Sequence, residues 1–395
     1  MTDLKISRNL EIPDELRVAR ARALPNLGAR MLFFSGGSAL NETARELKTF
    51  TQNSAHLITP FDSGGSSQVL RQAFDMPAVG DLRSRLMALA DETVLGQPDI
   101  FRLFSYRLPR DGEPEALASE YRALLAGKHP LMQAVSQPMR SLILTQLAAF
   151  DALRSESFDF RNASVGNLIL TGGYFVNGRA LEPVLFLMSK MVEVQGTVRA
   201  IVDDNFQIGA ELADGTRIIG QRELSGKEVP PLTQPIKRLF LARDGREVPP
   251  GEAPLPKRNR RLIERADLIC YAPGSLFTSV IANLLPKGVG RAVAERNVPK
   301  VYVPSLGPDP ECPGLDLSDQ VGAILSALRA DAGTACPAEA LMSCVLCDKA
   351  AVNKSARRAV EKTHGIPCLA TSLCDSGSKE RYDPAKLCKA LVSFT

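Results

Sequence analysis

Residues 31–74 read MLFFSGGSALNETARELKTFTQNSAHLITPFDSGGSSQVLRQAF, and this stretch passes twice from an apolar run through a glycine-serine loop into helical spacing. The apolar runs Met31–Phe34 and His56–Thr59 predict two strands, because each is short and ends at a glycine loop. Strands that alternate with helices in this way favour a mainly parallel sheet covered by helices.

The same order returns in the second half of the chain. The apolar run Leu268–Tyr271 leads into a third loop, Pro273-Gly274-Ser275. Further strands are predicted at Val301–Val303, Leu341–Cys347 and Pro367–Ala370, and helices at Leu276–Leu285, Leu317–Arg329 and Lys354–His364. An earlier helix is predicted at Val165–Val176. We therefore predict an α/β fold with one main parallel sheet, and ligands of such sheets bind outside the carboxyl ends of the strands.

Residues 196–242 interrupt this alternation, because their apolar side chains tend to recur at every second position. Short antiparallel strands are predicted at Thr197–Val202, Phe206–Leu212 and Thr216–Gly220. Asp214-Gly215 predicts a hairpin of type I′, whose two central residues need positive φ. We interpret the segment as a β-rich insertion within a single α/β domain of residues 30–395, preceded by an N-terminal extension of residues 1–29.

Composition limits the classes of function. The chain has 395 residues, of which 45% are hydrophobic, so it can bury a large core. Its 48 Lys and Arg against 44 Asp and Glu give a net charge of +4, which argues against nucleic acid or a membrane as a partner. No apolar run approaches the roughly 20 residues of a membrane span and the N-terminus lacks a signal-peptide pattern, so we expect a cytoplasmic protein.

The three glycine-serine loops together predict a phosphate site. They are Ser35-Gly36-Gly37-Ser38, Asp62-Ser63-Gly64-Gly65-Ser66-Ser67 and Pro273-Gly274-Ser275. Glycine lets the backbone approach a ligand, serine hydroxyls donate hydrogen bonds, and a following helix N-terminus favours negative charge. Any one loop could instead be a tight strand-to-helix turn. Neither the dinucleotide-binding fingerprint nor the P-loop pattern is present, so the site is expected to differ from both.

Asp62 stands out because a carboxylate at the mouth of a phosphate loop repels the ligand unless a cation lies between them. This position predicts Mg²⁺ binding or general-base chemistry on an acceptor hydroxyl. The alternative is a turn in which its oxygens accept the amides of Gly64 or Gly65. Nearby, Asp81 is predicted to be a helix N-cap, and Arg83 can either bind a phosphate or lie on a solvated helix face.

Four cysteines towards the C-terminus offer a different chemistry. Cys344, Cys347, Cys368 and Cys374 could form a tetrahedral Zn²⁺ site. The run from Cys344 to Cys347 is predicted to be a buried strand, however, and free cysteine is commonly buried as a small apolar residue. We therefore favour structural thiols, and a zinc-stabilised interaction protein remains an alternative.

Five motifs in a fixed order give the chain a resemblance to a known family. They are Phe34-Ser35-Gly36-Gly37-Ser38, the loop of residues 62–67, Gly80-Asp81-Leu82-Arg83, Val165-Gly166-Asn167-Leu168 and the segment Ala272–Ser279. With these motifs, from about Arg30 to the last helix, the chain resembles the CofD family. That family includes the 2-phospho-L-lactate transferases and the YvcK-type gluconeogenesis factors, which bind UDP-sugars.

The resemblance implies a Rossmann-like three-layer α/β/α fold with a nucleoside diphosphate site at the strand ends. It also implies that Asp62 lies at the reaction centre and that Mg²⁺ is a cofactor held at Asp62. The implied nucleotide and phosphate contacts are Gly36, Gly37, Ser38, Gly64, Gly65, Ser66, Ser67, Arg83, Asn167, Gly274 and Ser275.

Two departures from the family pattern concern the glycine loops: Ser38-Ala39 stands where the family usually has Thr-Gly, and Phe277 where it has tyrosine. The segment Asn53–Asp62 resembles most the CofD-related proteins of the GAK system, which implies a functional link to an ATP-grasp enzyme. A homodimer is compatible with the sequence. Our first hypothesis is a transferase acting on a nucleoside diphosphate-linked donor, and the alternative is a non-catalytic, nucleotide-sugar-binding regulator of the YvcK type.

Overall fold

A parallel sheet forms the centre of the protein. The computed structural model describes residues 9–93, 96–226, 229–375 and 377–395. The sheet strands are β1 (Met31–Ser35), β2 (Ala55–Ile58), β3 (Thr197–Ala200), β8 (Leu268–Tyr271), β9 (Lys300–Tyr302), β10 (Cys344–Asp348) and β11 (Cys368–Thr371). Their order is β11-β10-β9-β8-β1-β2-β3, and all neighbouring pairs are parallel.

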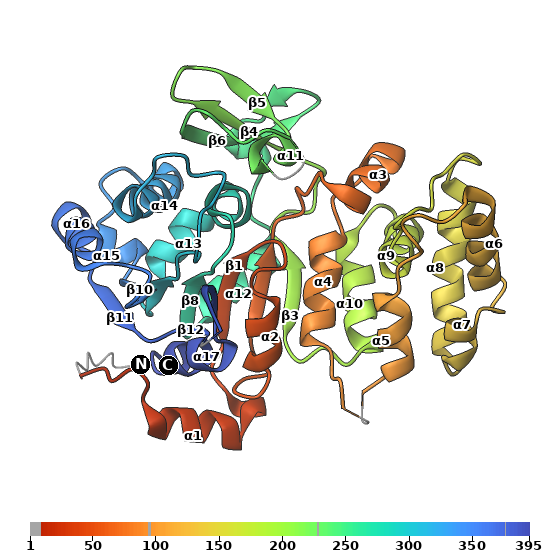
Figure 1. Ribbon diagram of the computed structural model, residues 1–395, viewed down its shortest axis with the longest axis horizontal. Coiled ribbons are helices and arrows are strands. Elements are labelled where there is room, and N and C mark those ends of the chain that lie inside the picture. The colour runs from red at the N-terminus through yellow and green to blue at the C-terminus, as the bar shows by residue number, and fades with distance from the viewer. Residues whose placement is uncertain (1–8, 94–95, 227–228, 376) are drawn as a thin grey trace.

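Helices cover both faces of this sheet (Figure 1). One face carries α1 (Glu15–Ala23), α2 (Asn41–Leu47) and α17 (Pro384–Val392), and the other carries α12 (Lys257–Arg265), α13 (Val289–Glu295), α14 (Leu317–Ala332), α15 (Ala338–Leu341) and α16 (Lys354–His364). Strand β1 shows why both faces are covered, because successive side chains of a strand point to opposite faces. Met31 and Phe33 lie in the core that includes α1, α2 and α17, whereas Leu32 and Phe34 lie in the core that includes α12 to α16. The predicted three-layer α/β/α fold is confirmed.

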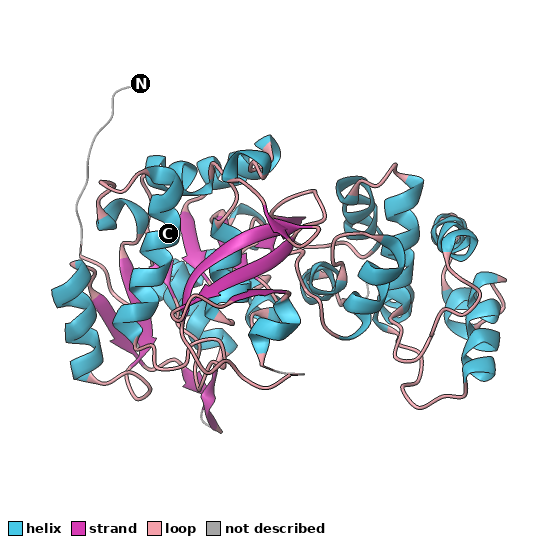
Figure 2. Ribbon diagram, turned by 90° about the horizontal axis from the view of Figure 1, so that it is seen from above, coloured by secondary structure: helices cyan, strands magenta, loops and turns pink. Residues whose placement is uncertain are grey.

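A helical insertion lies between β2 and β3. It consists of α3 (Gly65–Phe74), α4 (Gly80–Leu89), α5 (Pro98–Ser105), α6 (Pro114–Leu125), α7 (Pro130–Ala134), α8 (Met139–Leu153), α9 (Val165–Val176) and α10 (Leu181–Met191). Figures 1 and 2 show that α5 to α10 extend to one side of the sheet, away from α14 and α16. The insertion has its own core, which reaches the sheet at Ile58, Val198 and Ala200.

A separate antiparallel sheet follows β3, as predicted. It contains β4 (Gln207–Leu212), β5 (Arg217–Ile219), β6 (Ile236–Arg243) and β7 (Arg246–Glu247), in the order β5-β4-β6-β7. The antiparallel assignment of Thr197–Val202 is wrong, because β3 pairs in parallel with β2. The reason for this error is that β3 is an edge strand whose residues alternate between buried and half-buried positions, a pattern more typical of antiparallel strands.

The predicted hairpin at Asp214-Gly215 joins β4 and β5, but its turn is not of type I′. Gly215 has a φ of +87°, whereas Asp214 does not have positive φ. The Asp214 carboxylate instead accepts the amide of Thr216 at 2.9 Å. A longer loop with glycine in the left-handed position is therefore present, since the aspartate stabilises its own turn.

The remaining elements are short. They are α11 (Gln221–Ser225), the 3₁₀ helices η1 (Pro25–Leu27), η2 (Pro250–Glu252) and η4 (Ile281–Leu284), the π-helical turn η3 (Leu276–Val280), and the hairpin β12 (Cys374–Asp375) with β13 (Ser378–Tyr382). Among the described residues, no helix combines the length and the apolar character needed to cross a membrane.

Candidate functional site

The three glycine-serine loops lie at one edge of the central sheet. They follow β1, β2 and β8, which are neighbours in the order β8-β1-β2 and run in the same direction. The chain builds outward from β1 through β2 to β3 and then returns to β8 on the other side of β1, so the strand order reverses between β1 and β8 (Figure 1). Ligands of open α/β sheets bind at such a reversal, outside the carboxyl ends of the strands.

The first loop passes between the end of β2 and the turn that follows β8. A methyl group on Gly36 would lie 2.6 Å from Thr59 Oγ1 and 3.1 Å from Ser279 Oγ, so only glycine fits there without a shift of its neighbours. The next residue, Gly37, has a φ of +49°, which also favours glycine. On the outer side, Ser38 and Pro273 line a cavity of about 500 Å³ between the first and third loops.

The second loop places Asp62 beside the start of α4. The Gly64 amide donates to Asp62 Oδ1 at 3.1 Å, so the turn considered as an alternative role for Asp62 is present. A methyl group on Gly80 would lie 2.6 Å from Ser67 Oγ, 3.8 Å from Asn167 Nδ2 and 3.8 Å from Asp62 Oδ2. A carboxylate and a hydroxyl of the second loop and an amide of α9 therefore surround one point at the start of α4.

Arg83 and Arg107 bring positive charge to the second loop. Arg107 Nη1 and Asn167 Nδ2 each donate to Ser66 Oγ at 3.4 Å. The Arg83 side chain packs against Gly166 of α9, since a methyl group there would lie 2.7 Å from Arg83 Cδ. Burial and the charge of Arg107 lower the pKa of Arg83 to about 10, so Arg83 still carries its charge at neutral pH. Arg107 was not predicted, because it lies outside the three glycine-serine loops and the five motifs.

Two buried polar atoms at this position have no hydrogen-bond partner among the residues that the structure describes: Arg83 Nε and Asn167 Oδ1. Buried polar groups are nearly always paired, so unpaired ones need an explanation such as an absent ligand or water. Ionised donors bind anionic oxygens about twice as strongly as neutral ones. A positively charged site with an unpaired arginine donor, beside a glycine-serine loop, is therefore suited to an anion.

Asp81 and Arg85 connect the first loop to α4. Asp81 was predicted to be the N-cap of this helix, which is wrong: the N-cap is Val79, and Asp81 Oδ2 accepts the Gly37 amide at 2.6 Å. The helix begins two residues earlier than expected, so the carboxylate lies in its first turn and reaches the loop. Arg85 is fully buried and donates to Ser35 Oγ at 3.1 Å. This role of Arg85 was not predicted, since arginine is rarely buried.

His56 is held neutral beneath the first loop. Arg85 Nη1 lies 2.9 Å from His56 Nδ1, and because arginine can only donate, Nδ1 accepts and Nε2 donates to Ser54 Oγ at 3.1 Å. Burial, and then the charge of Arg85, lower the pKa of His56 well below its usual value. The unfolded chain therefore takes up a proton below about pH 6.5 while the folded protein does not. We expect the free energy of unfolding, measured by urea denaturation, to fall by about 1.4 kcal/mol from about pH 7.5 to pH 5.5.

A pair of histidine variants tests this assignment. His56→Gln should remove most of the pH dependence over this range, whatever its effect on absolute stability. His364→Gln, at the end of α16, should keep it. If His56→Gln retains the full dependence, other groups are responsible.

The third loop has its amides occupied from within the protein. The Gly274 amide donates to Ser305 Oγ at 2.9 Å and the Leu276 amide to Asp309 Oδ2 at 2.8 Å. Glu311, fully buried, accepts the amide of Thr278 at 2.8 Å. These carboxylates come from the segment between β9 and α14, more than thirty residues away, so the sequence alone did not reveal them.

The C-terminal cysteines lie in and beside the sheet as free thiols. Burial raises the pKa of Cys344 to about 12 and that of Cys347 to about 11, which disfavours thiolate ligands. In the described parts of the chain, no group of three or more His, Cys, Asp and Glu side chains is arranged to hold a metal ion. Asp62 and Ser67 fit a different mode, in which Mg²⁺ takes one carboxylate and completes its shell with ligand phosphates and water.

Several known proteins are similar to this chain in sequence. A family model described as "2-phospho-L-lactate transferase CofD" matches residues 31–373. A protein of Nostoc sp. named "Putative gluconeogenesis factor" is 28% identical over 384 residues, covering 93% of this chain and 69% of its own length. The "Gluconeogenesis factor" of Halalkalibacterium halodurans is 28% identical over 296 residues, covering 75% of this chain and 72% of its own length.

A solved structure supports the fold. It is the crystal structure of a member of the UPF0052 family from Bacillus halodurans, which superposes with a TM-score of 0.67 over 92% of this chain and 99% of that chain. The sequence identity is 23%, so this likeness concerns the fold alone.

Proposed function

The chain belongs to the CofD family, and we propose that it binds a nucleoside diphosphate-linked small molecule where β8, β1 and β2 end. The observation that carries the proposal is the convergence of three glycine-serine loops at the reversal of the strand order. Backbone amides at such loops favour the phosphate groups of a ligand. The unpaired atoms of Arg83 and Asn167 add donors and an acceptor at the same place.

The residues proposed to contact the ligand lie in the loops at this edge of the sheet or pack against those loops. The serine hydroxyls of the first two loops, with amides other than those of Gly37 and Gly64, would bind the diphosphate. Arg83 and Arg107 would neutralise its charge. The full proposed set is Gly36, Gly37, Ser38, Gly64, Gly65, Ser66, Ser67, Arg83, Arg107, Asn167, Gly274 and Ser275.

We propose further that the chain transfers a phosphorus-containing group from this ligand to an alcohol, as the name of the matching family model suggests. The acceptor oxygen would bond to the outer phosphorus while the phosphoanhydride bond breaks and the nucleoside monophosphate leaves. Asp62 would take the proton of the acceptor hydroxyl, since its carboxylate is fixed by Gly64 beside Ser67. Bound Mg²⁺, held at Asp62, would supply neutralising charge on the phosphates.

A second candidate is a binding protein without turnover. The names of the curated relatives favour it, since those from Nostoc sp. and Halalkalibacterium halodurans are gluconeogenesis factors rather than transferases. Both candidates use the same binding site. They differ in whether incubation with ligand and acceptor releases a nucleoside monophosphate.

We expect at least one nucleoside diphosphate or nucleoside diphosphate-sugar to raise the melting temperature, with Mg²⁺ increasing the shift. A ligand present at a hundred times its Kd stabilises the folded state by about 2.7 kcal/mol, which is several degrees even for a chain of this size. Differential scanning fluorimetry across purine and pyrimidine compounds, with and without Mg²⁺, measures this.

The matched variants for this experiment are two arginines of the helical insertion. Arg83→Gln should abolish the shift, because it removes the buried charge at the second loop. Arg102→Gln should keep it, since Arg102 is exposed on α5 and pairs only with Asp99. Absence of any shift across the whole panel would contradict the proposed site.

A further inference from the structure

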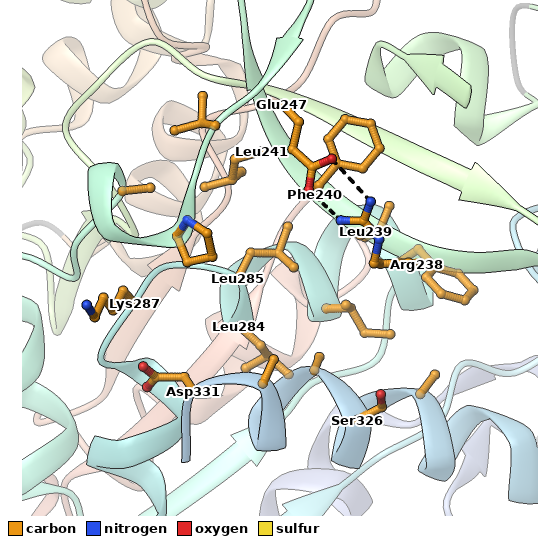
Figure 3. A pocket seen from close by; sticks show the side chains of 18 of the residues that line it. Arg238, Leu239, Phe240, Leu241, Glu247, Leu284, Leu285, Lys287, Ser326 and Asp331 are labelled. Carbon is orange, nitrogen blue, oxygen red and sulfur yellow. Dashed lines mark hydrogen bonds and ion pairs between the residues drawn. The ribbon is translucent and has the colours of Figure 1, made fainter. Parts of the chain in front are cut away.

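A second cavity lies between the antiparallel sheet and α14, on elements other than the first two glycine loops. Its volume is about 450 Å³, within the range of small-molecule sites. Figure 3 shows Leu284 and Leu285 between the strand that carries Leu239 and Leu241 and the helix that carries Ser326. Nothing in the proposed nucleotide site requires this cavity.

Most of the cavity wall is apolar. Strand β6 contributes Ile236, Leu239 and Leu241, the turns η3 and η4 contribute Phe277, Ile281 and Leu284, and α14 contributes Ala323, Ala327 and Ala330. The three alanines recur at helical spacing on one side of α14, where larger side chains would fill the space. The cavity therefore results from small residues on one helix facing large ones on a strand.

The walls restrict what can enter. Leu239 is 6% exposed, Leu241 4% and Leu284 1%, so these side chains are recessed from the surface. The surface of another protein cannot reach such side chains, whereas a single aliphatic chain can. Transfer of its methylene groups from water to these walls favours binding.

The mouth of the cavity carries positive charge. Lys287 and Arg291 line it and are exposed, and neither side chain forms an ion pair with any residue that the structure describes. The carboxylate of Asp331 is also at the mouth, where it accepts the backbone amide of Arg291 at 2.9 Å. At the other end, Arg238 is already paired with Glu247 (Figure 3). We propose that this cavity binds one aliphatic chain with an anionic head group, which lies at Lys287 and Arg291.

The test uses two amphiphiles with the same chain and opposite head groups. Dodecanoate should bind the full-length protein with one-to-one stoichiometry in isothermal titration calorimetry, below its micelle concentration. Dodecyltrimethylammonium should bind at least tenfold more weakly, because its head group is repelled at the mouth. The double variant Lys287→Glu/Arg291→Glu should weaken dodecanoate at least tenfold, whereas Lys362→Glu, on the exposed face of α16, should not change its affinity.

A second variant tests the chain-binding part independently. Ala327→Phe fills the cavity from α14 and should abolish binding of both amphiphiles. The matched variant Ala116→Phe, on an exposed position of α6, should not change binding. Circular dichroism checks that each variant is folded. Absence of saturable dodecanoate binding, or binding unaffected by Ala327→Phe, would overturn the proposal. Equal affinity for both amphiphiles would overturn the head-group assignment. A dimer that Ala327→Phe dissociates in sedimentation would instead make the cavity an interface between copies.

Discussion

Asp62→Asn is expected to lower group transfer by about 10²–10⁴-fold and to leave the nucleotide affinity measured without Mg²⁺ almost unchanged. Asparagine keeps the shape of the side chain, and its amide oxygen can still accept the Gly64 amide that Asp62 Oδ1 now accepts. The turn, and with it the second loop, should therefore persist. What is lost is the negative charge, and with it the ability to take a proton or hold Mg²⁺. Release of nucleoside monophosphate, followed by chromatography, measures the transfer, and calorimetry measures the affinity.

Two further variants make this result specific. Asp62→Ala removes both the charge and the hydrogen bond to Gly64, so it should impair binding as well as transfer. Asp204→Asn changes an exposed carboxylate of a neighbouring polar cavity and should affect neither. If the wild-type protein releases no product with any alcohol, the Mg²⁺-dependent part of the thermal shift becomes the readout, and Asp62→Asn should abolish it. Full transfer activity in Asp62→Asn would remove Asp62 from the mechanism.

The sheet could be predicted because its signals are local. The buried strands β1, β2 and β8 are short apolar runs, and a glycine loop follows each of them; Leu268–Tyr271 forms β8 with the predicted bounds. Helices with strong start and stop signals were also predicted with their true bounds, such as Val165–Val176 and Lys354–His364. For α16, Asn353 caps the start and Gly365 adopts the left-handed conformation at the end.

The secondary-structure predictions were wrong where contacts with distant parts of the chain determine the local conformation. Strand β3 alternates like an antiparallel strand only because it lies at the edge of the sheet. The segment 276–285 was predicted to be one helix, but it divides into a π-helical turn and a 3₁₀ helix. Its first amides are capped by Asp309 and Glu311 from another loop, which no local pattern can reveal.

In the candidate site, too, the local features could be predicted and the contacts between distant segments could not. The glycine and serine residues of its loops could be predicted, because glycine before a helix has a direct conformational meaning. The charges around them could not: Arg107 lies on the helical insertion, and Arg85 is buried against His56. These contacts depend on how the insertion packs on the sheet, and no local sequence pattern predicts that packing.

Within the insertion, α8 and α9 approach each other closely. Gly172 of α9 faces the backbone of α8, and a methyl group on it would overlap the carbonyl oxygen of Gln146 and lie 3.0 Å from the Phe150 amide nitrogen. Neither atom can move without shifting the helix that carries it. Helix α9 also carries Asn167, so the distance between α8 and α9 influences where the amide of Asn167 lies relative to the second loop.

Gly172→Ala is therefore expected to lower the free energy of unfolding by about 3 kcal/mol or more, because the added methyl group forces two packed helices apart. Urea denaturation followed by circular dichroism measures this. Gly251→Ala is the matched control, since no atom lies within 4 Å of its added methyl group and it should leave stability almost unchanged. The nucleotide-induced thermal shift should also decrease in Gly172→Ala and persist in the control. A Gly172→Ala protein of wild-type stability would mean that α8 and α9 are farther apart than described.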